Sequence, residues 1–293
     1  MTPCDIPTPA HMAGQGSPLV LLHGLGGTWH IWKPVLPALE AHHRVIALTL
    51  PGHHGAPAYD GSGDAAVAGL ADQVIDTLRQ QGIARAHVAG NSLGGWLAIE
   101  LARRGFAMSV TAFSPAGAWR SDADYRAVAT PFRIFYAIVG VILFIARLFN
   151  GATWLRKALT RQMMEHGERL SAADFLGMLR AMANTSVLRG LLRTMGRDGP
   201  VAPLDAGSVP IRIAWGACDA VIPYPRYGAP FVERIGGAEA TTVAGVGHVP
   251  TYDDPARIAA SILEVTRRAE ESSARADDAP AKVLAATDAG RVQ

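Results

Sequence analysis

The chain has 293 residues, of which 49% are hydrophobic and 18% charged, and this apolar content excludes disorder along the whole length. With 27 Lys and Arg against 25 Asp and Glu, the net charge of +2 is too small to indicate nucleic acid as a partner. The two cysteines, Cys4 and Cys218, are too few for a disulfide framework or a thiolate metal site, and a reducing cytoplasm is the expected compartment.

The N-terminal segment, residues 1–16, has no hydrophobic period and is predicted to be flexible, without the pattern of a signal peptide. After it, short apolar runs alternate with helical patterns at residues 31–39 and 67–78. This alternation predicts an α/β fold with a mostly parallel sheet flanked by helices. The expected strands are at residues 18–22, 45–50, 87–90, 110–113, 211–215 and 240–243.

Residues 116–205 break the alternation, because their hydrophobic pattern is helical. They contain 12 Lys and Arg against 7 Asp and Glu, which is a net charge of +5. We therefore predict an α/β core formed by residues 17–115 and 206–270, with a helical cap inserted at 116–205. Residues 271–293 are rich in Ala and charged side chains without apolar periodicity and are predicted to be a disordered tail.

The most specific chemical signal is Gly90-Asn91-Ser92-Leu93-Gly94, a G-x-S-x-G motif between a predicted buried strand and a predicted helix. In this context a sharp turn holds the serine in strained geometry, and the flanking glycines avoid Cβ clashes. The Ser92 hydroxyl then lies at a helix N-terminus, whose dipole favours developing negative charge. We predict a nucleophile; the alternative is a glycine-lined loop in which Ser92 only caps a helix.

A serine nucleophile needs a base and an orienting acid, and on this architecture the chain order is serine, acid, histidine. Asp219 and His248 each directly follow a predicted strand downstream of Ser92. Both are therefore expected at the carboxyl edge of the sheet, where open α/β sheets place their sites. We predict Asp219 as the acid and His248 as the base.

Stabilising the oxyanion of such a reaction requires hydrogen-bond donors. The backbone N–H of Leu93, directly after the nucleophile, is one predicted donor. The second is expected in the glycine loop at residues 23–27, where we predict the N–H of Leu25, with that of Gly26 as the alternative. His23 is predicted to fix this loop rather than to act as the base.

Together these motifs resemble those of the α/β-hydrolase superfamily, in the branch with a helical cap after the sixth strand. The similarity extends from about Ser17 to about Arg267 and includes the turn at residues 50–52. It implies an α/β-hydrolase fold with a hydrolytic activity, and the form of the serine motif is similar to that of carboxylesterases and carbon–carbon-bond hydrolases. Ser92 argues against the haloalkane dehalogenase and epoxide hydrolase branches, which use an aspartate there.

The sequence departs from this family in two places. Thr49 stands where the family usually has an aspartate before its Leu50-Pro51-Gly52 turn, and the N-terminus is too short for the usual leading pair of strands, so six or seven strands are expected. In some relatives the acid follows an earlier strand, which keeps Asp122 and Asp124 as alternatives to Asp219.

The expected activity is hydrolysis of a small hydrophobic carboxylic ester through an acyl-enzyme. We predict no metal and no other cofactor, because no metal-ligand spacing, phosphate loop or dinucleotide fingerprint is present. The residues expected to line the substrate pocket are Gly24, Trp96, Phe135, Phe144, Met178, Met182, Val221 and Val249.

Two other functions stay open. The first is hydrolysis of a carbon–carbon bond in a vinylogous diketone acid, for which Arg120, Arg126 or Arg180 would bind carboxylates. The second belongs to a different class, a hydrolase-like ligand-binding protein with little turnover.

The apolar run at residues 134–146 is shorter than the roughly 20 residues of a membrane-spanning helix. A helix that is apolar on all sides indicates burial between the cap and the sheet, and the alternatives are that it lines the substrate pocket or contacts lipid. The flanking Arg133 and Arg147 and the net charge of the cap suit peripheral contact with an anionic membrane surface.

Overall fold

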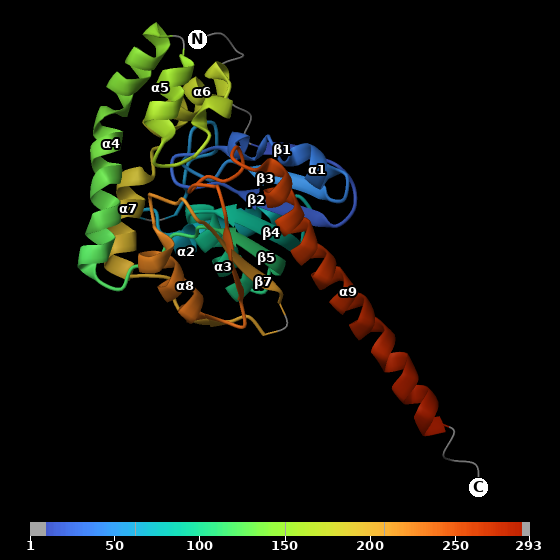
Figure 1. The fold of residues 1–293 in the computed structure, drawn as a ribbon. Coiled ribbons are helices and arrows are strands. Elements are labelled where there is room, and N and C mark those ends of the chain that lie inside the picture. Colours follow the sequence, from blue (N-terminus) through green and yellow to red (C-terminus); the bar gives the residue numbers. More distant parts are fainter. Residues whose placement is uncertain (1–9, 62, 150, 208, 289–293) are drawn as a thin grey trace.

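A mostly parallel sheet with helices on both faces carries a helical cap on one side (Figure 1). The structure is a computed structural model that describes residues 10–61, 63–149, 151–207 and 209–288. The seven strands of the main sheet are β1 (Ala10–Ala13), β2 (Pro18–Leu22), β3 (Arg44–Leu48), β4 (Ala86–Asn91), β5 (Ala107–Phe113), β7 (Ile211–Gly216) and β9 (Glu239–Val243). Their order is β1-β3-β2-β4-β5-β7-β9. A separate parallel pair consists of β6 (Leu204–Asp205) and β8 (Ile235–Gly236).

Residues 10–13 were expected to be flexible, and they form the edge strand β1 instead. It pairs antiparallel with β3, from Ala10 opposite Leu48 onward. Pairing satisfies backbone groups that the edge of β3 would otherwise expose. His11 adds a 2.6 Å hydrogen bond to Glu40. Residues 1–9 of the predicted flexible segment lie outside the described residues.

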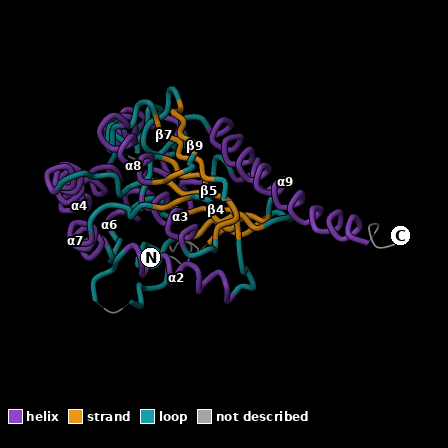
Figure 2. Tube along the Cα trace, turned by 90° about the horizontal axis from the view of Figure 1, so that it is seen from below, coloured by secondary structure: helices purple, strands orange, loops and turns teal. Residues whose placement is uncertain are grey.

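Two apolar layers place the sheet between helices (Figure 2). One face packs against α2 (Val67–Gln80), α3 (Leu93–Arg103) and α8 (Ala229–Arg234), the last preceded by a short π-helix, η4 (Tyr224–Gly228). The other face packs against α1 (Leu36–Glu40) and the start of α9 (Pro255–Asp288). The single helix expected at residues 31–39 is divided into a 3-10 turn, η2 (Trp29–Trp32), and α1, because Pro34 and Pro37 remove backbone donors.

The C-terminal helix α9 continues to Asp288, through most of the segment that was predicted to be a disordered tail. Its first turns are buried on the sheet through Ile258, Ile262 and Val265, and the remainder projects away from the body (Figure 1). A helix that is already nucleated by packing can propagate into this segment because Ala is its commonest residue, although Pro280 removes one backbone donor. Residues 289–293 of the predicted tail lie outside the described residues.

The cap consists of α4 (Asp122–Leu148), α5 (Thr153–Thr160), η3 (Gly167–Arg169), α6 (Ala172–Ala183) and α7 (Leu188–Asp198). The helix α4 has 27 residues and is, within the described residues, the one helix long and apolar enough to cross a membrane by length and composition. Only 17% of its apolar window is buried, so the expectation of a helix buried on all sides is wrong. Its inner face packs through Val139, Leu143 and Ala146, whereas its outer face is exposed.

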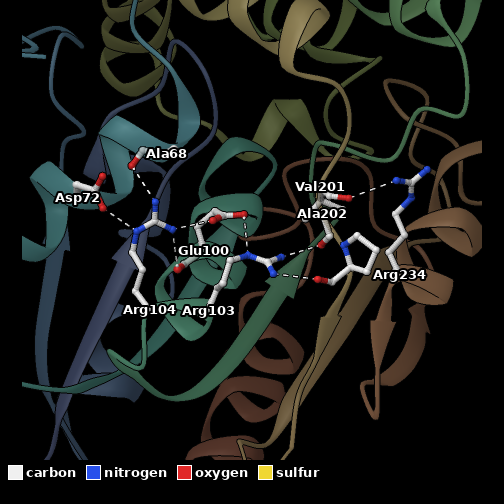
Figure 3. Close-up of polar contacts among 9 residues, drawn as sticks. Ala68, Asp72, Glu100, Arg103, Arg104, Val201, Ala202 and Arg234 are labelled. Atoms are coloured by element: carbon white, nitrogen blue, oxygen red, sulfur yellow. Dashed lines mark hydrogen bonds and ion pairs between the residues drawn. The ribbon is translucent and has the colours of Figure 1, made fainter. Parts of the chain in front are cut away.

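The helix that follows Ser92, α3, is anchored at its C-terminal end by two arginines (Figure 3). Arg104 donates to the carboxylates of Asp72 on α2 and Glu100 one turn earlier, each at 2.7 Å. Arg103 donates to the carbonyls of residues 202 and 203, where the chain leaves the cap. These contacts fix the direction of α3 relative to both the sheet layer and the cap.

Candidate active site

Ser92 lies in the turn between β4 and α3, with φ 55° and ψ −115°. Such a positive φ is strained for a residue with a side chain, and here the surrounding packing imposes it. A Cβ atom on Gly90 would lie 2.0 Å from the carbonyl oxygen of Gly94, and one on Gly94 would lie 2.1 Å from that of Leu22. Only glycines permit this close approach, so the motif spacing holds Ser92 at the N-terminus of α3.

The structure brings His248 and Asp219 together as a buried pair. Nδ1 of His248 donates to Oδ2 of Asp219 at 2.8 Å. The other carboxylate oxygen accepts from the N–H groups of Val221 and Ile222, both at 2.9 Å. Because Nδ1 carries the proton of the bond to Asp219, Nε2 is left as the unprotonated nitrogen, and His248 lines the same cavity as Ser92.

The alternative acids lie elsewhere. Asp124, on the first turn of α4, accepts a hydrogen bond from Nε of Arg226 at 2.8 Å. This ion pair lowers the pKa of Asp124. Asp122 is exposed on the same turn. The hydrogen bond between His248 and Asp219 therefore favours Asp219 as the orienting acid.

Asn91 holds the loop of His248, a role that the sequence analysis missed. Its Nδ2 donates to the carbonyl of His248 at 2.7 Å and to that of Phe113 at 3.2 Å. The side chain is buried next to Ser92. It thus ties the loop of His248 to the strands that carry the nucleophile.

Asp253 is a second residue that the sequence analysis missed. Its buried carboxylate accepts from the N–H of Gly247 at 2.8 Å and from those of Glu165 and His166 in the cap, at 3.1 and 2.8 Å. Asp253 therefore joins the loop of the base to the cap. Its position five residues after His248 was the only available signal.

The two predicted oxyanion donors belong to segments that lie next to Ser92. The N–H of Leu93 is the first in α3 and belongs to the amides without a partner inside the helix. The loop of Leu25 passes directly against the nucleophile, since a Cβ on Gly24 would lie 3.1 Å from that of Ser92. The alternative residue, Gly26, lines a cavity together with Leu25 and Ser92, so it stays an alternative donor, and a Cβ on it would meet the Tyr136 hydroxyl of the cap.

His23 fixes this loop from within the core. Its Nδ1 donates to the carbonyl of Gly24 at 2.7 Å, and its Nε2 accepts from the N–H of Leu50 at 2.9 Å. Burial and the neighbouring His53 hold the pKa of His23 well below its usual value. A neutral ring with both nitrogens in backbone hydrogen bonds is a structural residue and is not available as a base.

We expect the protein to lose stability as the pH falls below 6.5. Burial lowers the pKa of His53 to about 4 and that of His23 as well, so between pH 6.5 and 4 the unfolded chain binds protons that the folded chain refuses. Above pH 6.5 both rings are neutral in the folded and the unfolded chain, and the free energy of unfolding is highest. It decreases as the pH falls toward 4. The melting temperature measured from pH 7.5 to 5 should therefore fall, and His53→Asn should flatten the slope. A melting temperature equal at both ends would contradict this.

Two small apolar cavities, of about 40 Å³ each, meet at Ser92. The aromatic cavity is lined by Ser92, Leu93, Trp119, Tyr125, Tyr227 and other largely apolar side chains. The methionine cavity is lined by Ser92, His248, Met163, Met164, Met178 and Met182 among others. Ser92, Leu25 and Phe132 line both, so an ester with its carbonyl at Ser92 would place one group on each side.

Most residues predicted to line the pocket do so. Gly24, Met178, Met182 and Val249 line the methionine cavity, and Val221 lines the aromatic cavity.

Three of the predicted pocket residues lie elsewhere. Trp96 is buried in the core, with its ring 5.5 Å from that of Trp119. Phe135 packs in the cap cluster. Phe144 is 63% exposed on the outer face of α4. The sequence analysis missed Phe132, on the same helix, because helical periodicity does not tell which face meets Ser92.

Within the described residues, one group has the composition of a metal site, and it includes His87 at the start of β4, whereas Ser92 follows the other end of that strand. His43, His87 and Glu270 place ligand atoms within 4.8 Å of one another. Both ring nitrogens of His43 already bind the hydroxyls of Ser17 and Thr266, each at 2.9 Å. The group therefore acts as a hydrogen-bond network that holds α9 on the sheet.

Comparison with known proteins agrees with this architecture. The model of the "Alpha/beta hydrolase family" matches residues 19–261. The epoxide hydrolase EphH of Mycobacterium tuberculosis is 31% identical over 193 residues, which cover 64% of this chain and 89% of that protein. Among solved structures, an enol-lactonase from Burkholderia xenovorans LB400 superposes with a TM-score of 0.67 at 19% identity, covering 88% of this chain and 95% of that one. A thermophilic esterase from Thermogutta terrifontis gives 0.66 at 20%, covering 89% and 93%.

Proposed function

Since the chain belongs to the alpha/beta hydrolase family and is a hydrolase, we propose that it cleaves a hydrophobic carboxylic ester through an acyl-enzyme on Ser92. The observation that carries this proposal is the bond between Nδ1 of His248 and Asp219, which leaves Nε2 as a base on the wall of the cavity that also contains Ser92. A serine hydroxyl is a weak nucleophile without such a base.

In the proposed reaction, Nε2 of His248 takes the hydroxyl proton as Oγ of Ser92 attacks the ester carbonyl carbon. The carbonyl oxygen becomes an oxyanion, which accepts from the N–H groups of Leu25 and Leu93. Collapse of this tetrahedral intermediate breaks the bond between the carbonyl carbon and the ester oxygen. The alkoxide takes the proton from His248 and leaves as the alcohol. Water, deprotonated by the same imidazole, then attacks the acyl carbon and releases the carboxylic acid, while Asp219 stabilises the imidazolium in each half-reaction.

The side chains that line the two cavities at Ser92 support a hydrophobic substrate. Around Ser92 the aromatic cavity presents mostly apolar side chains, and burying each methylene of a substrate there is worth up to about 0.8 kcal/mol. Its volume of about 40 Å³ suits a short group on this side. The methionines on the other side are adaptable and accept groups of different shape.

The nucleophile itself argues against epoxide hydrolysis, the activity for which the relative from Mycobacterium tuberculosis is named. Attack of Ser92 on an epoxide carbon would open the ring and leave an ether on the serine. An ether has no carbonyl carbon for water to attack, so each enzyme molecule would react once and its serine would stay modified. A carboxylic ester instead leaves an acyl group that His248 and water can remove.

A specific observation keeps carbon–carbon-bond hydrolysis as a second candidate. Arg180 lines a cavity of about 220 Å³, and Met164 and Met178 line both this cavity and the methionine cavity. Its guanidinium could bind a substrate carboxylate. Arg120 lines none of these three cavities and is paired with Glu233.

Active-site labelling followed by a substrate panel tests the proposal. We expect a fluorophosphonate probe to modify Ser92 stoichiometrically, as located by peptide mass spectrometry, and p-nitrophenyl esters to turn over. Absence of labelling would favour a binding protein over an enzyme of this mechanism. Faster turnover of a ring-cleavage dienoate than of any ester in the panel would replace ester hydrolysis with cleavage of a carbon–carbon bond.

A further inference from the structure

The outer face of α4 is an apolar stripe that nothing in the described part of the chain covers. Five residues with alternating spacings of four and three form the stripe, and Phe144, Phe149 and Trp154 extend it. Val141 and Leu148 are 62% and 67% exposed. The stripe consists of Ile134, Ile138, Val141, Ile145 and Leu148. A run of exposed apolar side chains this long marks an interaction surface.

The charged residues in the part of the chain that carries the stripe, residues 125–164, all have the same sign. From residue 125 to residue 164 the chain contains no Asp or Glu, whereas it contains six cations. They are Arg126, Arg133, Arg147, Arg156, Lys157 and Arg161. Glu168, which lies beside Arg156 and Lys157, already accepts a hydrogen bond from His166. A surface that combines apolar side chains with mainly positive charge is complementary to anionic lipid headgroups over acyl chains.

The helix α5 completes one end of this surface. Trp154 is exposed, and its ring packs edge-on against Phe149 with the centroids 5.7 Å apart. Lys157 and Arg161 follow at spacings of three and seven residues and are also exposed. An aromatic ring beside cations is the composition favoured at the boundary between headgroups and acyl chains.

By length and composition α4 could cross a bilayer, but the packing of its inner face favours a helix that lies along a surface. Val139 and Leu143 pack with Phe175 of α6 in the cap core. Insertion of α4 across a bilayer would remove these packing contacts.

We propose that the outer face of α4 and α5 docks on an anionic lipid surface, with α4 in the plane of the interface. A second copy of the chain is a poorer occupant, because a symmetric dimer would bring the same cations together without an acid to pair with them. The opposite face of α4 supplies Phe132 to both cavities at Ser92, so docking would hold one wall of the candidate active site at the membrane. The docking itself is independent of the chemistry at Ser92.

Flotation of the full-length protein with liposomes tests the proposal. Vesicles of phosphatidylcholine with a quarter phosphatidylglycerol should carry the protein upward at low salt, and pure phosphatidylcholine should carry much less. Raising the salt to 1 M should release most of it, since screening removes attraction to the headgroups. The double variant Val141→Glu and Leu148→Glu should bind at least tenfold more weakly, and Arg147→Gln with Lys157→Gln about fivefold more weakly for each charge removed.

Two control variants show whether the loss of flotation belongs to this surface. Met12→Glu places the same charge at an exposed apolar residue on β1 and should float like the wild type. Ser92→Ala should also float normally, which distinguishes docking from the proposed ester hydrolysis. No flotation at low salt would overturn the proposal. Binding that survives both 1 M salt and alkaline carbonate would replace it with a spanning helix, and a dimer in sedimentation that Val141→Glu dissociates would replace it with self-association.

Discussion

Ser92→Ala should reduce kcat/KM for p-nitrophenyl butyrate by at least about 10⁴-fold, because the acyl-enzyme can no longer form. Folding should be unchanged. The positive φ is imposed by the close approach of Gly90 to Gly94 and of Gly94 to Leu22, which the substitution leaves intact. Alanine removes one oxygen atom and fits the same turn. Initial rates over a range of ester concentrations and a melting curve measure both quantities.

A result that contradicts the assignment is easy to recognise. If Ser92→Ala keeps more than a tenth of kcat/KM, less than about 1.4 kcal/mol of transition-state stabilisation was lost, and another group is the nucleophile. The fluorophosphonate probe should then label a different residue of the variant. A large fall in melting temperature would instead mean that the serine hydroxyl supports the fold.

Asp219→Asn should lower kcat by about 10⁴-fold with little change in KM. An amide oxygen still accepts from the N–H groups of Val221 and Ile222, so the loop keeps its shape. The amide NH₂ then faces Nδ1 of His248 and stabilises the tautomer with its proton on Nε2. That tautomer cannot accept the proton of Ser92.

Asp124→Asn is the matched control, because it makes the same change at the alternative acid. It breaks an ion pair with Arg226 on the surface and touches no residue of the proposed triad. We expect a rate within about twofold of the wild type. The reverse outcome, a normal rate for Asp219→Asn with a collapse for Asp124→Asn, would move the acid to the start of α4.

Much of the fold could be read from local sequence signals. Strands buried on both faces are mostly apolar, and this is why β2, β4 and β7 are recognisable, although β4 contains buried His87 and Asn91 and β7 contains buried Arg212. The serine turn was equally readable, because Gly90 and Gly94 occupy positions where any side chain would collide with a backbone carbonyl. The family resemblance then supplied the order of acid and base along the chain.

Other features depend on contacts between distant segments. Asn91 and Asp253 became visible as supports of the His248 loop only when their hydrogen-bond partners were in place, since a buried polar side chain has no periodic signal. The edge strand β1 depends on the unpaired side of β3, which residues 10–13 themselves do not encode.

The contrast is sharpest in the cap. The sequence by itself determined that residues 134–146 form an apolar helix, because side-chain hydrophobicity and the absence of proline are local properties. It could not determine which side of that helix is covered, since Ile138 and Val139 are equally apolar. Only the packing of α6 against one side decided that Val139 is buried and Ile138 exposed, and that Phe132 lines the cavities at Ser92 while Phe144 lies on the surface. Which face of an apolar helix is buried depends on the shape of its neighbours, and that is a property of the tertiary structure.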